Sequence, residues 1–240
     1  MNAKITSKTN PRVKELCLLR DHPKPTSFLI EGKHMVDMAF ERGLLDEVIT
    51  CKEVAYPGIR ILEVSEDVLS KIAPSNTPSG ILGVAHAPKG ERQGDALILD
   101  RIQDPGNVGT ILRSAASFGF KDIYVLPGTA SPFGSKALAS SQGAIFAALI
   151  HICTDSEATM RELSKQGYVL LGTSLRNAMP ISSYARPASR IALVLGNEGK
   201  GVDEKILSMC DQNLYIEMKD MESLNVGVAA GIAMYLLKTN

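Results

Sequence analysis

The second half of the chain repeats one pattern, in which a short and continuously apolar segment is followed by a polar loop and then by an amphipathic helix. The apolar segments predict strands at residues 96–102, 122–127, 168–175, 190–196 and 213–218, with a weaker candidate at 148–153. The amphipathic segments predict helices at residues 108–119, 135–144, 156–167, 203–209 and 225–238. Continuous apolar strands that alternate with helices are typical of a parallel sheet covered on both faces. We therefore expect an α/β fold in which the loops at the carboxyl ends of the strands bind the ligand.

The first 88 residues follow a less regular order of helices and strands. Helices are predicted at residues 10–20, 33–43 and 66–73, and strands at residues 27–32, 46–51, 60–65 and 80–88. This order predicts a small α/β sandwich. The segment PKGERQG at residues 88–94 is polar and contains one proline and two glycines, as linkers do. We expect two domains, at residues 1–88 and 95–240.

Composition and residue spacing exclude several classes of protein. The chain is 45% hydrophobic and 22% charged, which is typical of globular proteins. No apolar run reaches the roughly 18 residues that a membrane-spanning helix needs, and the first twenty residues lack the apolar core of a signal peptide. The four cysteines and four histidines are scattered, without the spacing of a zinc site or a disulfide framework. We expect a cytoplasmic protein that binds neither a membrane nor a metal.

The charge balance does not by itself point to nucleic acid. The 26 Lys and Arg residues equal the 26 Asp and Glu residues in number, so the net charge is zero. Locally, five basic residues face the single acid Glu15 in the first twenty positions: Lys4, Lys8, Arg12, Lys14 and Arg20. Two interpretations stay open, namely a solvated helix face and an arm that contacts phosphates.

Three loops of the second half combine glycine with asparagine, serine or glutamate. They are QDPGNVG at residues 103–109, NEGKG at 197–201 and KDMESLNVG at 219–227. Glycine allows the backbone to approach a ligand closely, whereas asparagine and serine supply hydrogen bonds and helix caps. Each loop alone has a plainer explanation, as a β-turn, a flexible glycine turn or a helix cap. Because all three follow strands of one parallel sheet, we expect them to meet at one edge and form a ligand site.

The familiar nucleotide and nucleophile motifs are missing from these loops. The first loop has no GxGxxG dinucleotide fingerprint, and Gly199-Lys200 is followed by glycine where a phosphate-binding P-loop needs serine or threonine. A GxSxG nucleophile elbow is also missing from the chain. A dehydrogenase, an NTPase and a serine hydrolase are therefore disfavoured.

Arg113 occupies an unusual position in the helix after the first loop. It lies beside the apolar stripe formed by Val108, Ile111, Leu112 and Ala115, and not opposite to it. Arginine offers five donors in a fixed geometry that suits phosphate or carboxylate. Arg113 is either a ligand-binding residue, at the sheet edge or in a subunit interface, or an ordinary surface arginine.

Three segments resemble, in order and spacing, the signature motifs of the SpoU (TrmH-type) RNA ribose methyltransferases of the SPOUT superfamily. They are DPGNVGTILRSAASFG, LVLGNEGKGV and IEMKDMESLNVGVAAGIAMYLL. The N-terminal segments ITSKTNPRVKELCLL and FLIEGKHMVDMAF are similar to the small RNA substrate-binding domain of that family. The resemblance covers nearly the whole chain.

The resemblance implies a fold, a cofactor and an activity. It implies a C-terminal parallel-sheet domain with a deep trefoil knot, S-adenosylmethionine bound by the three loops, and a homodimer. The implied reaction transfers a methyl group to a ribose 2′-hydroxyl of RNA, and ribosomal RNA is favoured over transfer RNA. A non-catalytic RNA-binding protein on the same scaffold is the alternative from another class.

The resemblance also implies roles for individual residues. Arg113 is implied to be the base for the 2′-hydroxyl, and four residues are implied to position the substrate: Asn107, Glu198, Ser223 and Asn225. The residues implied to surround the cofactor are Thr173, Ser174, Gly196, Ile216, Met218 and Leu224. The pKa of a guanidinium is so high that the group keeps its proton at any pH below about 12. Binding of the neighbouring phosphate by Arg113 is therefore an open alternative to proton abstraction.

Overall fold

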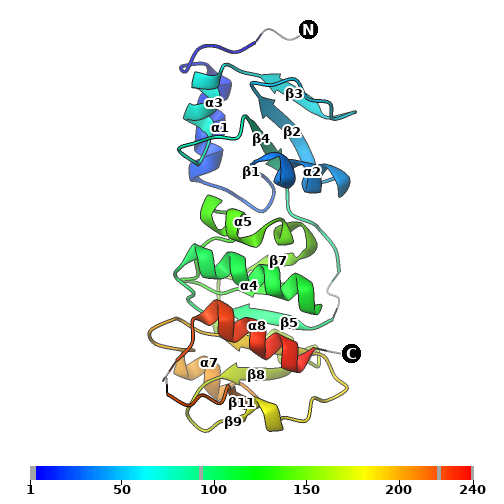
Figure 1. Cartoon of the computed structure of the whole chain (residues 1–240). Helices are drawn as coiled ribbons and strands as arrows, with labels where there is room; N and C mark the ends of the chain where they lie inside the picture. The colour runs from blue at the N-terminus through cyan, green and yellow to red at the C-terminus, as the bar shows by residue number, and fades with distance from the viewer. Residues whose placement is uncertain (1–3, 92–93, 221–222, 239–240) are drawn as a thin grey trace.

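The protein, described here from a computed structural model for residues 4–91, 94–220 and 223–238, contains two sheets that follow one another along its long axis (Figure 1). The N-terminal sheet has the strand order β1-β4-β2-β3. β4 is antiparallel to β1 and β2, whereas β2 and β3 run parallel. The strands are β1 (Phe28–Glu31), β2 (Leu45–Thr50), β3 (Arg60–Glu63) and β4 (Ile81–Ala85).

Helices cover both faces of the N-terminal sheet. They are α1 (Pro11–Asp21), α2 (Lys33–Glu41) and α3 (Glu66–Ile72). Leu29 of β1 packs with the buried residues of α1 and α3, whereas Phe28 and Ile30 pack with those of α2. Successive side chains of a strand point to opposite faces, so burial of both faces explains why this strand is continuously apolar. The predicted sandwich is confirmed.

The C-terminal sheet is parallel throughout and has the strand order β7-β6-β5-β10-β8-β11-β9. Its strands are β5 (Ala96–Leu99), β6 (Asp122–Val125), β7 (Leu149–Ile152), β8 (Val169–Thr173), β9 (Met179–Pro180), β10 (Ile191–Leu195) and β11 (Gln212–Tyr215). The order is not sequential, because β10 lies between β5 and β8. Such a crossover brings loops that are distant in the sequence to one edge of the sheet.

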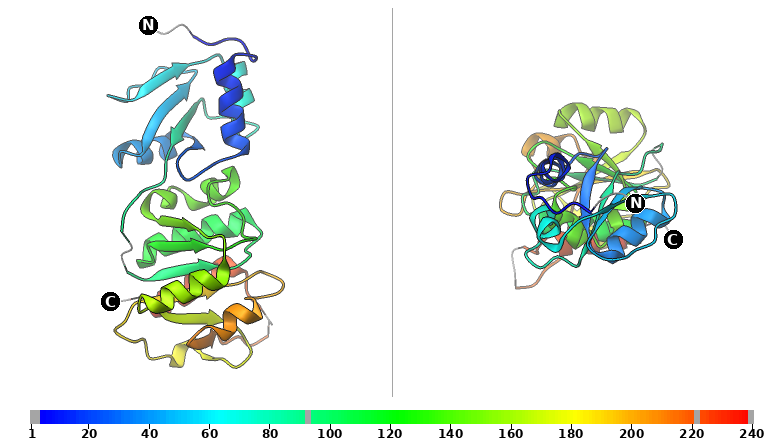
Figure 2. Two further views of the ribbon diagram at one scale, coloured as in Figure 1. Left: turned by 180° about the vertical axis from the view of Figure 1, so that it is seen from behind. Right: turned by 90° about the horizontal axis from the view of Figure 1, so that it is seen from above.

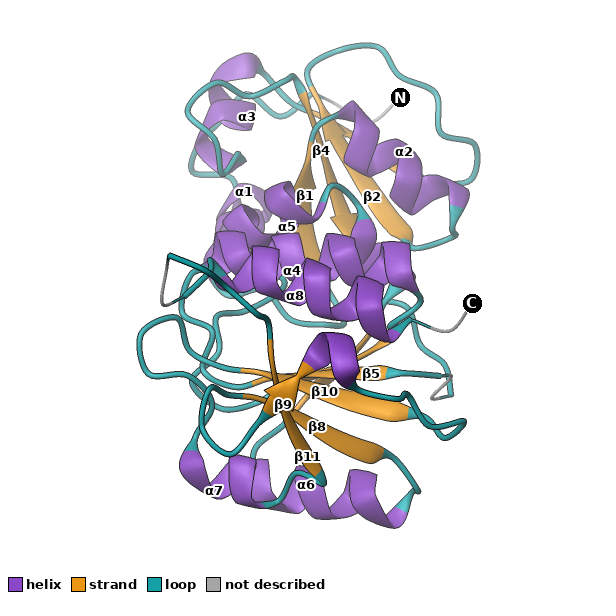
Figure 3. Ribbon diagram, turned by 60° about the horizontal axis from the view of Figure 1, so that its bottom comes forward, coloured by secondary structure: helices purple, strands orange, loops and turns teal. Residues whose placement is uncertain are grey.

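Helices lie on both sides of this sheet as well, with α4, α5 and α8 on one side and α6 and α7 on the other (Figures 1 and 3). The helices are α4 (Pro105–Phe118), α5 (Ser135–Ser141), α6 (Ser156–Lys165), α7 (Glu204–Ser208) and α8 (Val226–Leu237), with short 3-10 segments η1 (Ala144–Ala147) and η2 (Ile181–Ser183). The expected α/β architecture with a doubly covered parallel sheet is confirmed.

Three details differ from the sequence prediction. α4 begins at Pro105, earlier than predicted, because the Asp104 side chain caps its N-terminus. α5 ends at Ser141, where Gln142 and then Gly143 adopt positive φ angles of 48° and 86°. The two-residue edge strand β9 was not predicted, because it is too short to show a periodic pattern.

The two sheets share one continuous hydrophobic core. Phe28 of β1 lies with its ring centroid 5.1 Å from that of Phe133 and 6.3 Å from that of Phe146. Gly143 packs against Met38 of α2. The view from behind shows α5 and η1 below the N-terminal sheet, where these contacts form (Figure 2). Within the described ranges, no helix is long and apolar enough to cross a membrane.

Candidate active site

A cavity of about 500 Å³ opens where the loops after β8, β10 and β11 come together. The six residues that were predicted to surround the cofactor all line it: Thr173, Ser174, Gly196, Ile216, Met218 and Leu224. Ser223 lines it as well. Residues 221–222 of the third loop lie outside the described residues. Lining by loops at the carboxyl ends of parallel strands is the ligand position expected for this fold class.

Gly196 shapes the inner wall of this cavity. A Cβ atom at this position would lie 2.1 Å from the backbone nitrogen of Val202, which is far inside van der Waals contact. The absence of a side chain therefore allows the chain to fold back on itself after β10. The Asn197 amide donates to the carbonyl of Gly201 at 3.1 Å, and the Gly201 amide donates to the carbonyl of Asn197 at 2.9 Å. These bonds close the loop 197–201 tightly.

Asn107, Glu198 and Asn225 form one hydrogen-bonded chain across three loops. The Asn107 Nδ2 donates to Glu198 Oε1 at 2.9 Å, and the Asn225 Nδ2 donates to Asn107 Oδ1 at 3.0 Å. Asn225 also caps α8, because its Oδ1 accepts from the amides of Gly227 and Val228. The capping role and the site role of Asn225 therefore coexist. Asn107 does not cap α4, because the Asp104 side chain does so, and the Asn107 side chain bonds Glu198 instead.

The Glu198 carboxylate is held by donors from the first loop, at residues 103–107. Partial burial raises its pKa, but the hydrogen bond from Asn107 and the backbone amides of Gln103 and Asp104 lower it more, so the net pKa lies below the usual value. Hydrogen bonds to an ionised carboxylate favour the charged form. Glu198 is therefore a fixed negative charge that orients the Asn107 amide.

Arg113 lies apart from these residues. It is exposed on the outer side of α4, six residues after Asn107. In the part of the chain that the structure describes, its guanidinium has no hydrogen-bond or ion-pair partner, and only its carbonyl is used, by Ser117 Oγ. The structure thus brings four of the five predicted catalytic residues to one place, whereas Arg113 does not contact them within one chain.

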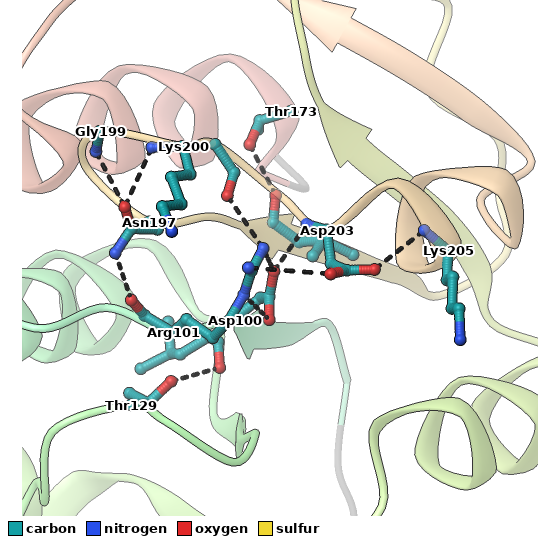
Figure 4. Close-up of polar contacts among 12 residues, drawn as sticks. Asp100, Arg101, Thr129, Thr173, Asn197, Gly199, Lys200, Asp203 and Lys205 are labelled. Atoms are coloured by element: carbon teal, nitrogen blue, oxygen red, sulfur yellow. Dashed lines mark hydrogen bonds and ion pairs between the residues drawn. The ribbon is translucent and has the colours of Figure 1, made fainter.

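Sequence reasoning missed two residues beneath this site, Asp100 and Asn197. Asp100 is only 2% exposed and accepts the backbone amide of Asp203 at 2.8 Å. The Asn197 Oδ1 accepts the amides of Gly199 and Lys200, both at 3.0 Å (Figure 4). An acid directly after a buried strand, and an asparagine two residues before a glycine, were the signals that could have identified them.

The basic N-terminal segment contacts its own domain. Lys8 pairs with Asp67, Arg12 binds Glu47 and Glu15, and Arg20 donates to the carbonyls of Lys71 and Ile72. These contacts favour a structural role for most of the segment. Lys4 and Lys14 are exposed and are the positions where the alternative of phosphate contact stays a prediction.

Comparison with protein families assigns both parts of the chain. Residues 95–235 match the SpoU rRNA Methylase family. The chain belongs to this family. Residues 10–83 match the MRM3-like substrate binding domain. The resemblance of the three loops to SpoU motifs is thereby confirmed.

Individual relatives match along most of their length. The chain is 36% identical to 23S rRNA (guanosine(2553)-2′-O)-methyltransferase RlmP of Bacillus subtilis, over 98% of both chains. It is 32% identical to 23S rRNA (guanosine-2′-O-)-methyltransferase RlmB of Acinetobacter baylyi, over 76% of this chain and 80% of the relative. A crystal structure of AdoMet-bound rRNA methyltransferase from Sinorhizobium meliloti matches with a TM-score of 0.85 and 26% identity, over 98% of this chain and 97% of the other.

The family and its cofactor-bound structure confirm the expected activity. The chain is an S-adenosylmethionine-dependent RNA ribose 2′-O-methyltransferase. The cavity fits this cofactor, because its volume of about 500 Å³ lies in the range of small-molecule sites and because Gly196 and the other five residues predicted to surround the cofactor line it. Among the described residues, no three His, Cys, Asp or Glu side chains lie close enough together to bind a metal ion.

Proposed function

We propose that the enzyme methylates the ribose of a guanosine in 23S rRNA. The observation that carries the proposal is the 36% identity to the RlmP enzyme over 98% of both chains. This similarity includes residues 10–83, which match a substrate binding domain, as well as the residues of the cavity. Similarity confined to the cavity would support the chemistry alone, whereas similarity in both parts supports a related RNA target.

The six cavity residues predicted from the motifs are proposed to hold S-adenosylmethionine. This cofactor supplies an electrophilic methyl group on a sulfonium. Thr173 and Gly196 belong to the ends of β8 and β10, and the Thr173 hydroxyl is anchored on the carbonyl of Val194 at 2.8 Å. Ile216, Met218 and Leu224 supply apolar wall from the third loop. A wall whose side chains are already anchored binds a ligand without a large cost of ordering them.

Asn107, Glu198, Ser223 and Asn225 are proposed to position the ribose beside that methyl group. Methyl transfer needs the attacking oxygen in line with the methyl carbon and the leaving sulfur, so orientation supplies much of the acceleration. The chain Asn225–Asn107–Glu198 locks the Asn107 amide in one orientation from both ends. Ser223 lines the cavity with its hydroxyl available from the third loop.

Arg113 is proposed to act in the cavity of a second copy of the chain. Its exposed side chain has no contact with its own Asn107 or Glu198 among the described residues, so one chain alone leaves the proposed site without its arginine. Next to it, α4 and α8 form a shallow groove of about 510 Å³ that is lined by the half-buried Phe118 and by exposed apolar residues unusual for a surface: Val228, Ile232, Tyr235 and Leu236. Exposed apolar surface of this kind marks interfaces. A homodimer through α4 and α8 would cover the groove and carry Arg113 to the partner.

The dimer has its own test. Val228 is 51% exposed on α8, and Val228→Glu places a charge in the proposed interface. We expect light scattering to show a dimer for the wild type and a monomer for this variant, together with loss of methylation. Ser164→Glu, an exposed position on α6 at the opposite side of the sheet, is the matched control and is expected to stay dimeric. A dimeric and active Val228→Glu protein would contradict the interface.

The remaining predictions complete the proposal. Residues 1–88 are proposed to bind the RNA and residues 95–240 to catalyse the transfer, in line with the family matches at 10–83 and 95–235. The enzyme is proposed to act in the cytoplasm, where ribosomal RNA is available to it. The deep trefoil knot near the C-terminus stays a prediction.

The test is a map of ribose 2′-O-methylation across total RNA from cells with and without this protein. Loss of methylation at one guanosine of 23S rRNA, restored by the purified enzyme with S-adenosylmethionine, supports the proposal. A lost site in transfer RNA would replace the substrate. Unchanged RNA in cells, together with no methyl transfer in vitro, would favour the non-catalytic RNA-binding alternative.

A further inference from the structure

Asp100 and Arg101 lie directly after β5 and beneath the loop 197–203, and the motifs assign no role to either residue. The Asp100 side chain is 3% exposed and that of Arg101 is 32% exposed. Arg101 has a φ angle of 57°, in the left-handed region that residues other than glycine rarely adopt. An unfavourable backbone conformation persists only where neighbouring contacts hold it. The polar contacts of Arg101 lead to its neighbour Asp100 and to the loop 197–203.

The guanidinium of Arg101 binds the end of this loop, both directly and through Asp100. Its Nε and one terminal nitrogen donate to the two oxygens of Asp100, at 3.1 and 3.0 Å. Asp100 in turn accepts the backbone amide of Asp203 at 2.8 Å. The same terminal nitrogen of Arg101 donates to the carbonyl of Gly201 at 3.4 Å, and the other lies 3.7 Å from the Asp203 carboxylate. The planar guanidinium thus joins the end of β5 to the last residues of the loop through several donors at once. The single ammonium group of a lysine could not make this bidentate contact.

The backbone of Arg101 forms a hydrogen bond with the beginning of the same loop. Its carbonyl accepts the Nδ2 of Asn197 at 2.9 Å. The Oδ1 of that asparagine accepts the amides of Gly199 and Lys200. In Figure 4, Arg101 lies between Asn197 on one side and Asp203 on the other. One residue therefore holds both ends of the loop, which the sequence places 96 and 102 residues away.

The loop that Arg101 holds carries two features of the site. Gly196, just before it, forms the cavity wall through its close approach to Val202, and Glu198 within it bonds Asn107. We propose that Arg101 is a positioning residue, which keeps the loop 197–203 in the conformation that receives S-adenosylmethionine. This inference rests on the proposed function of the cavity as the cofactor site.

Loss of the Arg101 contacts to the loop is expected to weaken cofactor binding without lowering kcat. The apparent dissociation constant of a ligand rises in proportion as the binding-competent conformation becomes less populated. A loop that is competent only about a tenth of the time would therefore bind S-adenosylmethionine about tenfold more weakly. At saturating cofactor the loop is closed again, so Glu198 returns to Asn107 and kcat is preserved.

The test uses three variants of the full chain. Arg101→Asn removes the guanidinium but keeps a residue that tolerates positive φ, so it separates the side chain from the backbone conformation. Arg101→Lys keeps the positive charge but loses the bidentate hydrogen bonds to Asp100. Arg161→Ala is the matched control, since Arg161 is a surface arginine of α6 with one ion pair to Glu157. Each protein is measured by calorimetric titration with S-adenosylmethionine, by hydrogen exchange of the peptide covering residues 197–203, and by kcat and KM for the cofactor.

We expect Arg101→Asn to weaken cofactor binding and to raise KM for the cofactor about tenfold, while kcat stays within about twofold. Exchange should rise at residues 197–203 and not in the N-terminal sheet, Arg101→Lys should fall in between, and Arg161→Ala should match the wild type. Cofactor binding of Arg101→Asn equal to that of Arg161→Ala would overturn the proposal. Faster exchange throughout the protein would also overturn it, because it indicates general destabilisation. Failure of the proposed function is distinguishable, since the wild type itself would then bind no S-adenosylmethionine.

Discussion

Replacement of Gly196 by alanine tests whether the close return of the chain after β10 shapes the cofactor cavity. The added Cβ would lie 2.1 Å from the Val202 nitrogen, 2.3 Å from the Gly201 carbonyl carbon and 2.6 Å from the Val202 Cα, whereas ordinary contact begins near 3.4 Å. All three are backbone atoms, so no side-chain rotation relieves the clash. The loop must therefore retreat by about 1.3 Å, the difference between 2.1 and 3.4 Å.

The size of the effect follows from that displacement. Overpacking of this kind costs about 1–3 kcal/mol of unfolding free energy, and each kcal/mol lowers the melting temperature of a domain of this size by roughly 2–4 °C. A shift of about 1 Å in a positioning element lowers catalysis by about 100-fold. We therefore expect Gly196→Ala to melt about 5 °C lower and to lose most methyl transfer, because the loop that carries Glu198 has moved.

The assay has an internal control in the same loop. A Cβ at Gly199 would meet nothing closer than the Asn197 Oδ1 at 3.7 Å, so Gly199→Ala adds the same methyl group without a clash. Both variants are compared by thermal melting, by calorimetric titration with S-adenosylmethionine and by transfer of labelled methyl groups to ribosomal RNA. The reasoning is refuted if Gly196→Ala binds the cofactor and methylates RNA as well as Gly199→Ala does.

Four further predictions concern single side chains. Arg113→Ala should abolish methylation while calorimetry shows unchanged cofactor binding, because Arg113 is proposed to act on the ribose or its neighbouring phosphate and is not among the residues that line the cofactor cavity; near-normal turnover would remove its proposed role. The Glu198 pKa is lowered from its usual 4.5, so its stabilising contribution is complete above that value and is lost only as the pH falls through the lower folded-state pKa. Thermal melts of Glu198→Gln against pH should therefore show a weaker loss of stability in acid than the wild type, and a parallel loss would contradict this. Phe28→Ala should lower the urea-unfolding free energy by about 3–5 kcal/mol, because it empties a fully buried position between the two sheets; a change near zero would show that the two parts do not share a core. Burial raises the pKa of the Cys210 thiol to about 12, so iodoacetamide near pH 8 should leave it unmodified in the folded protein and modify it in urea, as peptide mass spectrometry can show.

The arrangement of helices and strands was largely predictable from local sequence patterns. Phe28, Leu29 and Ile30 belong to a strand that is buried on both faces, so the continuous apolar run already indicated helices on both sides. Strand β7, the weaker candidate, is also the one whose residues are half-exposed at the sheet edge. β9 was missed because two residues carry no period. Burial leaves a local periodic signature, and the prediction succeeded where burial was strong.

The cavity residues were predictable because the motif resemblance supplied them and because loops at the carboxyl ends of parallel strands converge. The hydrogen bonds between them were not predictable. Asn107 and Glu198 are separated by 91 residues, and Asn107 and Asn225 by 118. Their contact depends on β10 entering the sheet beside β5, and the strand order is decided by packing of the whole chain.

By itself, the sequence determined the two α/β parts, the family and the candidate site residues, because helix and strand periods and motif spacing are properties of neighbouring residues. Only the tertiary structure decided which way those residues face. It turned Arg113 outward on α4, joined Asn107 to Glu198 and Asn225, and placed Arg101 beneath the loop 197–203. Direction and distance between loops depend on contacts across about 100 residues of chain, and such contacts leave no local pattern.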